Sequence, residues 1–161
     1  NISNVQLFMN FHIVAIGRAK PGPVQDSYNY YKKRLKWPLV LHELEVKRQI
    51  KGHLRKSHEA TLLSSRVRKN AFTVALDERG ATLSSSAFAN QLNIWTSQGF
   101  KNITFFIGGP DGLDKTIFSR TDSILSFGTM TWPHMLIRVM LVEQLYRAQC
   151  IKMGHPYHRS E

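Results

Sequence analysis

The chain has 161 residues, 42% of them hydrophobic and 20% charged, and these values fit a single globular domain. No apolar stretch approaches the length of a membrane span, and the single cysteine, Cys150, excludes an internal disulfide, so we expect a cytoplasmic protein. The formal net charge is +11, and residues 32–69 alone hold twelve Lys or Arg against three Glu. Such a concentrated basic region favours a polyanionic partner, most commonly nucleic acid, although a solvated basic face is the simpler alternative.

Short apolar runs alternate with amphipathic stretches along the chain. We expect strands at 11–16, 39–44, 71–76, 103–107 and 123–127, and helices at about 24–36, 53–66, 84–99, 115–121 and 133–153. Residues 77–80 should end the third strand, and residues 1–10 should be an extension ahead of a single domain at 11–161. The alternation predicts an α/β fold, with a mostly parallel sheet and helices on both faces.

A glycine-rich turn follows the fourth expected strand, with the sequence Gly108-Gly109-Pro110-Asp111-Gly112. Glycine lets the backbone approach a ligand closely, and ligands of parallel α/β sheets bind outside the carboxyl ends of strands. The turn does not match the phosphate-binding patterns, because Pro110 occupies the position of the second glycine and no Gly-Lys-Ser/Thr follows. It is therefore a candidate ligand site without a phosphate signature, or only a tight turn.

Two further loops follow strand ends, at Leu76-Asp77 and at Gly128 to Trp132. Neighbouring strands would bring all three loops to one edge of the sheet, where they could hold a nucleoside-like cofactor through backbone contacts. Three ordinary strand-to-helix loops are the alternative.

The last expected helix is apolar on every side between Met135 and Val142, with Arg138 as its one charge. Such a helix must be buried on every side, which indicates a homodimer; a central core helix is the alternative. Arg138 needs a partner, either a phosphate or carboxylate ligand or a structural acid. Glu143 and Arg147 have the spacing of a helix-surface pair.

The tail after this helix carries His155, Tyr157, His158 and Arg159, side chains typical of a substrate-binding site. The spacing of Cys150, His155 and His158 is a poor match to zinc sites, so we expect no metal.

Together these blocks resemble one family. The residues concerned are Gly108-Gly109-Pro110-Asp111-Gly112, Ser126 to His134, Arg138-Val139, Glu143 to Ala148, and His155-Pro156-Tyr157-His158-Arg159. Their order and spacing are similar to those of the bacterial ribosomal RNA large subunit methyltransferase H family, within the SPOUT superfamily of knotted methyltransferases. The resemblance covers about 11–159.

The resemblance implies a C-terminal trefoil knot, a homodimer, and S-adenosylmethionine bound in the knot. It implies methylation of N3 of a pseudouridine in 23S rRNA, in the large subunit or the assembled ribosome. The implied cofactor contacts are Leu76, Gly108, Gly109, Phe127, Gly128, Thr129, Met130, Thr131 and Trp132.

For the chemistry, we expect His158, His155 or Tyr157 as the base that removes the N3 proton. Arg138 and Arg159 are expected to stabilise the negative charge on the deprotonated pseudouridine ring or to bind phosphate. The role of Asp111 stays open. A SPOUT methyltransferase acting on another RNA base, or a non-enzymatic ribosome-binding protein, are the rival interpretations.

Overall fold

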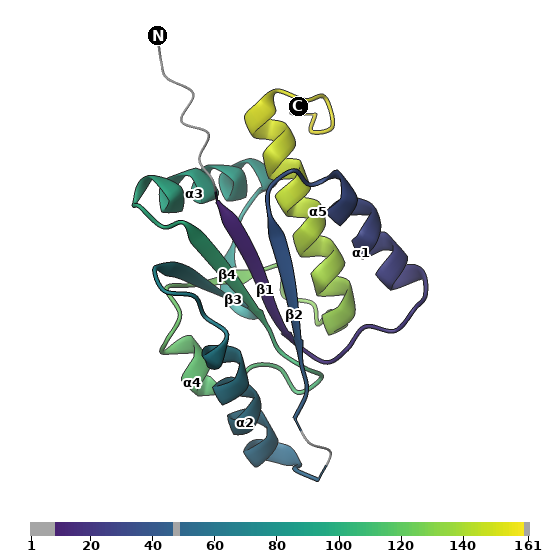
Figure 1. Ribbon diagram of the computed structural model, residues 1–161, viewed down its shortest axis with the longest axis vertical. Helices are drawn as coiled ribbons and strands as arrows, with labels where there is room; N and C mark the ends of the chain where they lie inside the picture. Colours follow the sequence, from purple (N-terminus) through teal and green to yellow (C-terminus); the bar gives the residue numbers. More distant parts are fainter. Residues whose placement is uncertain (1–8, 47–48, 160–161) are drawn as a thin grey trace.

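The computed structural model describes residues 9–46 and 49–159 of the chain. Its strands form one sheet in the order β2-β1-β4-β3-β5, and every pair of neighbours is parallel (Figure 1). The strands are β1 (Asn10–Ile16), β2 (Leu39–Leu44), β3 (Ala71–Thr82), β4 (Asn102–Ile107) and β5 (Ser123–Ser126). The predicted parallel α/β fold is confirmed.

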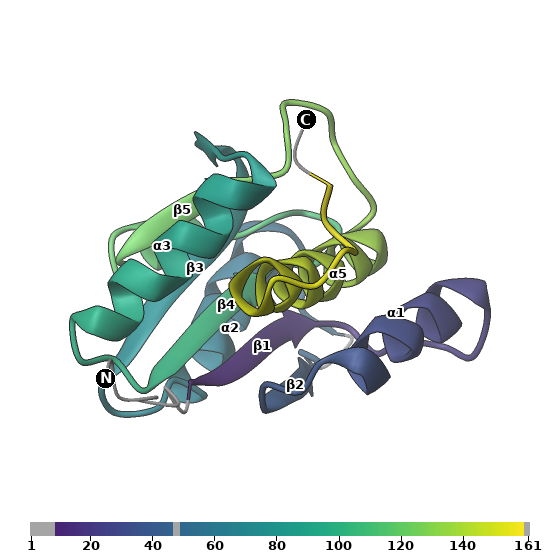
Figure 2. The same cartoon turned by 90° about the horizontal axis from the view of Figure 1, so that it is seen from above.

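The helices cover both faces of this sheet. They are α1 (Pro23–Arg34), α2 (Gly52–Ser65), α3 (Ser85–Ser97), α4 (Lys115–Phe118) and α5 (His134–Met153). One apolar core joins α1, α3 and α5 to the sheet, and a smaller one on the opposite face joins α2 and α4 to it (Figures 1 and 2). Along β1 the side chains alternate between the two cores, as the pleat requires: Ile13 faces the first and Val14 the second.

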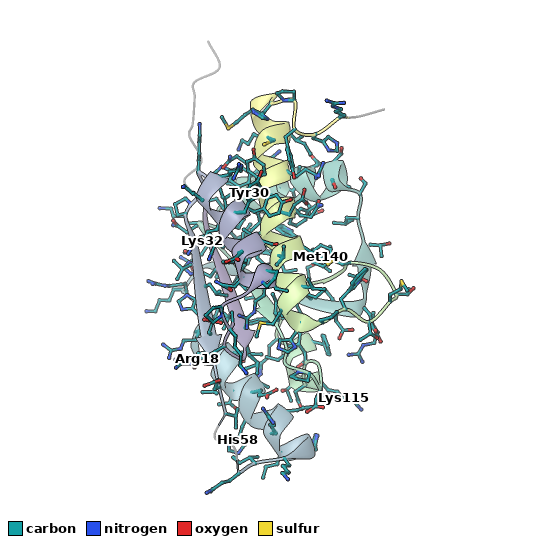
Figure 3. All side chains as sticks on the ribbon, turned by 90° about the vertical axis from the view of Figure 1, so that its right-hand side faces the viewer. Arg18, Tyr30, Lys32, His58, Lys115 and Met140 are labelled. Atoms are coloured by element: carbon teal, nitrogen blue, oxygen red, sulfur yellow. The ribbon has the colours of Figure 1, made fainter. Side chains whose placement is uncertain are left out.

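Helix α5 lies between α1 and α3 on the larger core (Figure 2). Its central position accounts for much of its apolar surface, since Leu141, Val142 and Leu145 are fully buried. Leu136 and Met140 are only half-buried and belong to neither core, and Met140 lies on the outer side of α5 in Figure 3. The helix begins after Pro133, one residue later than expected, and ends at Gly154, whose φ of 67° is the left-handed conformation that favours glycine.

Two sequence-based boundaries are corrected by the structure. Strand β3 does not stop at residues 77–80 but resumes pairing with β5 after a register shift between Leu76 and Ala81. Gly80 allows this return, because a Cβ there would lie 2.6 Å from the carbonyl oxygen of Ile124. At the other end of the chain, Asn10 pairs with Asn102 and Met9 is 3% exposed, so both belong to the domain rather than to an extension.

Smaller differences concern element ends. Helix α1 ends at Arg34, because Leu35 turns to an extended conformation and the Lys36 amide donates to Gln149 Oε1 at 2.6 Å. Helix α4 ends at Phe118 and β5 at Ser126, which places Phe127 in the following loop. Residues 1–8 of the expected extension lie outside the described residues. The trefoil knot stays a prediction.

Candidate functional site

The carboxyl ends of β3, β4 and β5 are neighbours in the sheet, and the three predicted loops meet there. They enclose a cleft of about 330 Å³. Eight of the nine predicted cofactor contacts line it, and Thr129 is the exception. The eight are Leu76, Gly108, Gly109, Phe127, Gly128, Met130, Thr131 and Trp132.

The glycine loop forms one wall of this cleft as a tight backbone structure. The Gly112 amide donates to the Gly109 carbonyl at 3.0 Å, and a Cβ on Gly108 would lie 2.7 Å from the Gly112 carbonyl carbon. Gly109 packs against Ile16 of β1, where an added Cβ would come within 3.1 Å of Ile16 Cγ2. The loop therefore folds tightly on itself and on β1 because both positions lack a side chain.

The opposite wall is apolar and partly open. Leu125 and Ile137 line it, while Met130 and Trp132 remain 72% and 41% exposed at its rim. Exposed apolar side chains at the mouth of a cleft are available to cover a bound molecule.

The charged side chains that line the cleft are three carboxylates and two cations: Asp77, Glu78, Asp111, Lys56 and Arg79. Asp77 pairs with Arg79 at 2.7 Å, and hydrogen bonds from Arg79 lower the pKa of the Asp77 carboxyl. Glu78 accepts a hydrogen bond from Thr131 Oγ1 at 3.4 Å. Because Arg79 is paired with Asp77, the carboxylates of Glu78 and Asp111 leave a small acidic excess over Lys56. Apolar walls with an acidic excess suit a cationic nucleoside better than a phosphate, so the residues present fit S-adenosylmethionine.

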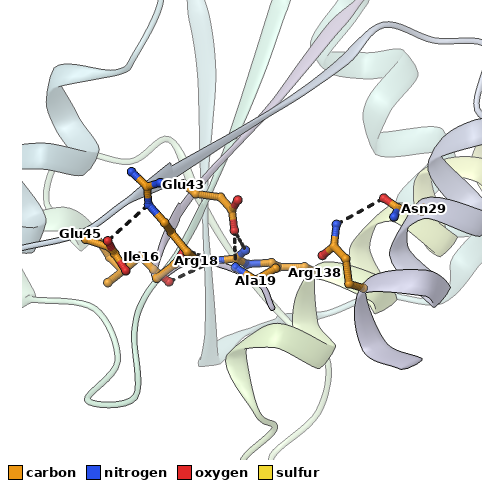
Figure 4. A network of polar contacts seen from close by, with 9 residues as sticks. Ile16, Arg18, Ala19, Asn29, Glu43, Glu45 and Arg138 are labelled. Atoms are coloured by element: carbon orange, nitrogen blue, oxygen red, sulfur yellow. Dashed lines mark hydrogen bonds and ion pairs between the residues drawn. The ribbon is translucent and has the colours of Figure 1, made fainter. Parts of the chain in front are cut away.

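Arg138 forms a structural ion pair with an acidic side chain of the same chain, which is one of the two roles expected from the sequence. Its side chain is 2% exposed, and its Nη1 donates to Glu43 Oε2 at 2.7 Å (Figure 4). Its Nη2 donates to the carbonyls of Ile16 and Gly17 at 3.1 and 2.8 Å. A buried guanidinium held by a carboxylate and two carbonyls fixes α5 to the end of β1, so we do not retain Arg138 as a phosphate clamp or catalytic group.

The tail packs around Glu143 and Arg147 near the C-terminal half of α5. Tyr157 donates to Glu143 Oε1 at 2.9 Å, and Arg147 bonds the same oxygen at 2.6 Å and lies over the Tyr157 ring. His158 lies 3.4 Å from both Arg147 Nη1 and Ser86 Oγ. The Glu143–Arg147 pair that the sequence predicted therefore also holds the tail against α5.

This packing bears on which tail residue could act as a base. Burial, together with hydrogen bonds to Tyr31 and Glu143, raises the pKa of Tyr157, so its phenol stays protonated and is a poor proton acceptor at neutral pH. His155 is exposed and its Nδ1 accepts the Tyr157 amide at 3.2 Å, and Arg159 is exposed.

The cleft lies at the start of α5, whereas the tail leaves the opposite end of the helix and folds back to its middle. The cleft contacts the start of this helix through His134 and Ile137, whereas the tail follows Met153. The tail returns along α5 as far as Glu143, which is about 14 Å from His134 along the helix axis. None of residues 155–159 lines the cleft, so within one chain the structure does not bring the predicted tail residues to the predicted cofactor residues.

His134 is a site residue that the sequence analysis missed. It lines the cleft at the first residue of α5, and burial followed by the positive charge of Arg138 lowers its pKa. The usable signal was its spacing of four residues from Arg138, which places both on one helix face.

Two absences concern the described residues only. Residues 9–46 and 49–159 contain no group of three His, Cys, Asp or Glu side chains placed to hold a metal ion. In the same part of the chain, no helix combines the length and the apolar character that crossing a membrane requires.

Comparison with known proteins places this fold and cleft in a family. A protein-family model described as "Predicted SPOUT methyltransferase" matches residues 9–158. The chain is 51% identical over 152 residues to a ribosomal RNA large subunit methyltransferase H from Rhodospirillum centenum, covering 94% of this chain and 100% of the relative. It is 48% identical over 151 residues to a protein of the same name from Paramagnetospirillum magneticum, covering 94% and 99%.

Solved structures agree at the level of the fold. A probable methyltransferase from Bordetella pertussis Tohama I superposes with a TM-score of 0.55 at 13% identity, covering 89% of this chain and 98% of the other. A probable methylase family protein from Haemophilus influenzae Rd KW20 also gives 0.55, at 11% identity, covering 95% and 72%. The chain is a SPOUT methyltransferase, and within that class it belongs to the family of its relatives named ribosomal RNA large subunit methyltransferase H.

Proposed function

We propose that this methyltransferase uses S-adenosylmethionine to methylate 23S rRNA of the large ribosomal subunit, at N3 of a pseudouridine. The observation that carries the proposal is the cleft formed by the loops after β3, β4 and β5, which gathers eight of the nine expected cofactor contacts. The names of the relatives support the RNA substrate, and the basic segment 32–69 supplies the charge to bind it. A ribosomal substrate also implies action in the cytoplasm.

In this proposal the cofactor supplies a methyl group that is already activated on a sulfonium, so the protein has mainly to bind and orient. Gly108 and Gly109 would let the backbone lie against the nucleoside, and Phe127 to Trp132 would cover it. Asp77, Glu78 and Asp111 would favour its positive charges. Holding the methyl and the attacking nitrogen in line provides much of the acceleration.

A second copy of the chain resolves the separation between tail and cleft. Leu136 and Met140 leave an apolar strip on the outer side of α5, which supports a homodimer through this helix. If the two α5 helices pack antiparallel, the tail of one subunit lies near the cleft of the other. His155, His158 and Arg159 would then act on the partner subunit's substrate.

The central test is mass-spectrometric mapping of 23S rRNA methylation in cells with and without this protein. Loss of one methyl-pseudouridine in the deletion strain, restored by the gene, supports the proposal. Loss of a methyl group on a different base supports the rival SPOUT activity. Unchanged rRNA, together with no heat of S-adenosylmethionine binding in calorimetry, supports the non-enzymatic ribosome-binding protein.

The tail and the dimer have separate tests. His158→Ala and Arg159→Ala should each lower methylation of large subunits or ribosomes while cofactor affinity stays unchanged. Wild-type activity in both variants would remove the tail from the active site. Light scattering should give twice the chain mass, and a monomer at micromolar concentration would refute the dimer.

A further inference from the structure

A second cavity, of about 410 Å³, lies beside the cofactor cleft. It is bounded by the loop from Arg18 to Pro23 after β1, by the first two turns of α1, and by the start of α5. His134 is the one described residue that lines both this cavity and the cleft. The two spaces are thus neighbours with an imidazole ring in their common wall.

Two residues that line the cavity carry buried hydrogen-bond donors without acceptors. Among the described residues, Tyr28 Oη and Arg138 Nε have no hydrogen-bond partner, and both side chains are 2% exposed. Burial raises the pKa of Tyr28 to about 12, so its hydroxyl remains a donor. A buried donor without an acceptor costs stability, which a ligand carrying acceptor oxygens would restore after small side-chain shifts.

The rim adds positive charge and free backbone amides. Arg18 and Lys20 are exposed there, and Arg18 pairs with the exposed Glu45 at 3.3 Å. Helix α1 begins at the cavity with Gly22 as its N-cap and no side-chain cap. Pro23 has no N–H, so the amides of Val24 and Gln25 are the ones available to an anion, in a first turn that also carries Asp26. Pro21, Val24 and Met135 supply apolar surface between these polar groups.

On the basis of the function proposed above, we infer that this cavity receives the target nucleotide of the RNA. Its pyrimidine ring packs against Val24 and Met135, and its carbonyl oxygens face the donors of Tyr28 and Arg138. Its phosphates lie at Arg18, Lys20 and the first amides of α1. A second copy of the chain does not need these donors and cations, whereas a uridine-type nucleotide uses both.

His134 then lies between the base and the methyl donor. It is partly exposed, makes no hydrogen bond within the described residues, and its lowered pKa keeps it neutral and able to accept a proton. In the reaction, the N3 proton of the nucleobase passes to a ring nitrogen of His134, which leaves RNA binding rather than proton removal to His155 and His158 of the tail. The nitrogen lone pair forms the bond to the methyl carbon as the carbon–sulfur bond breaks, and the sulfur leaves as a neutral thioether.

The test measures single-turnover methylation of large subunits isolated from the deletion strain, with cofactor affinity measured separately. Val24→Trp fills the cavity and should lower kcat/KM for the RNA substrate by more than about tenfold. Tyr28→Phe, which removes one donor, should lower it by roughly 3- to 10-fold. Ile94→Trp on α3 and Tyr30→Phe are matched controls, because Ile94 and Val24 are 39% and 38% exposed.

His134→Gln gives a different signature. It should lower kcat by about 100-fold, with KM for the RNA substrate changed by less than ~3-fold, because it removes the proton acceptor and leaves the nucleotide cavity in place. A merely structural role would lower the melting temperature and raise KM instead.

Three outcomes would overturn the inference while leaving the proposed function intact. One is wild-type kinetics in Val24→Trp and Tyr28→Phe. Another is weaker S-adenosylmethionine binding in Val24→Trp, which would assign the cavity to the cofactor. The third is a monomer in light scattering of Val24→Trp, which would assign it to a second copy. Failure of the wild-type protein to methylate any subunit RNA would instead refute the proposed function.

Discussion

Gly108 is the position where one added methyl group should damage the cofactor cleft most directly. In Gly108→Ala the new Cβ would lie 2.7 and 2.8 Å from the carbonyl carbon and oxygen of Gly112, and 2.9 Å from the Leu113 amide nitrogen. All three neighbours are backbone atoms, so no rotamer change relieves the contact and the turn itself must open. Overpacking of this kind costs about 1–3 kcal/mol, which corresponds to a fall in Tm of roughly 3–10 °C.

The same opening moves a wall of the cleft, so cofactor affinity should fall as well. A loss of about 1.4 kcal/mol is a tenfold increase in Kd, and we expect at least that in calorimetric titration with S-adenosylmethionine. Gly99→Ala separates stability from binding. Its φ is +93° and no atom lies within 4 Å of the added Cβ, so it carries backbone strain of about 1–2 kcal/mol in the turn before β4, away from the cleft.

The expected pattern is a lower Tm for both variants and a higher Kd for Gly108→Ala alone. Wild-type Kd in Gly108→Ala would refute the assignment of this turn to the cofactor. An equal rise of Kd in Gly99→Ala would show that affinity only follows stability.

Three further predictions concern stability and RNA binding. Arg138→Met should lower the free energy of unfolding by about 2–4 kcal/mol in urea titration, because it leaves the Glu43 carboxylate without its cation; a loss below ~1 kcal/mol would contradict the anchoring role. Burial lowers the pKa of His12 and of His42 below the usual 6.5, so the unfolded chain takes up protons first as the pH falls. The free energy of unfolding should therefore decrease from pH 7.5 to 5.5, and an increase would contradict the cause given. RNA affinity should fall steeply with salt in filter-binding assays, and Arg68→Ala should flatten the slope by about one unit; a slope near zero would refute phosphate binding.

Much of the fold could be read from the sequence, because buried parallel strands are continuous apolar runs. The runs at 39–44 and 103–107 correspond to strands within one residue. The end of β3 could not be read in this way. Asp77 to Gly80 look like a turn, yet the strand resumes beyond them, because β5 offers a second register and Gly80 lacks the Cβ that would clash with Ile124.

Only part of the candidate site could be predicted from the sequence. The cofactor loops were predictable, because the carboxyl ends of neighbouring parallel strands must meet. Arg138 was ambiguous, since its acid partner Glu43 lies 95 positions away and no local pattern connects them. The position of the tail was also hidden, because sequence proximity to α5 does not say which end of the helix faces the cleft.

The order of strands has a consequence for synthesis of the protein. β1 is an interior strand of the sheet, yet its partner β4 begins at Asn102, and the chain between them contributes only one neighbour to β1, the strand β2. A nascent chain that has not emerged beyond Ile107 therefore carries an apolar strand with one edge unpaired. Folding of the domain must wait until most of the chain has left the ribosome, and a stall before that point would expose an aggregation-prone intermediate.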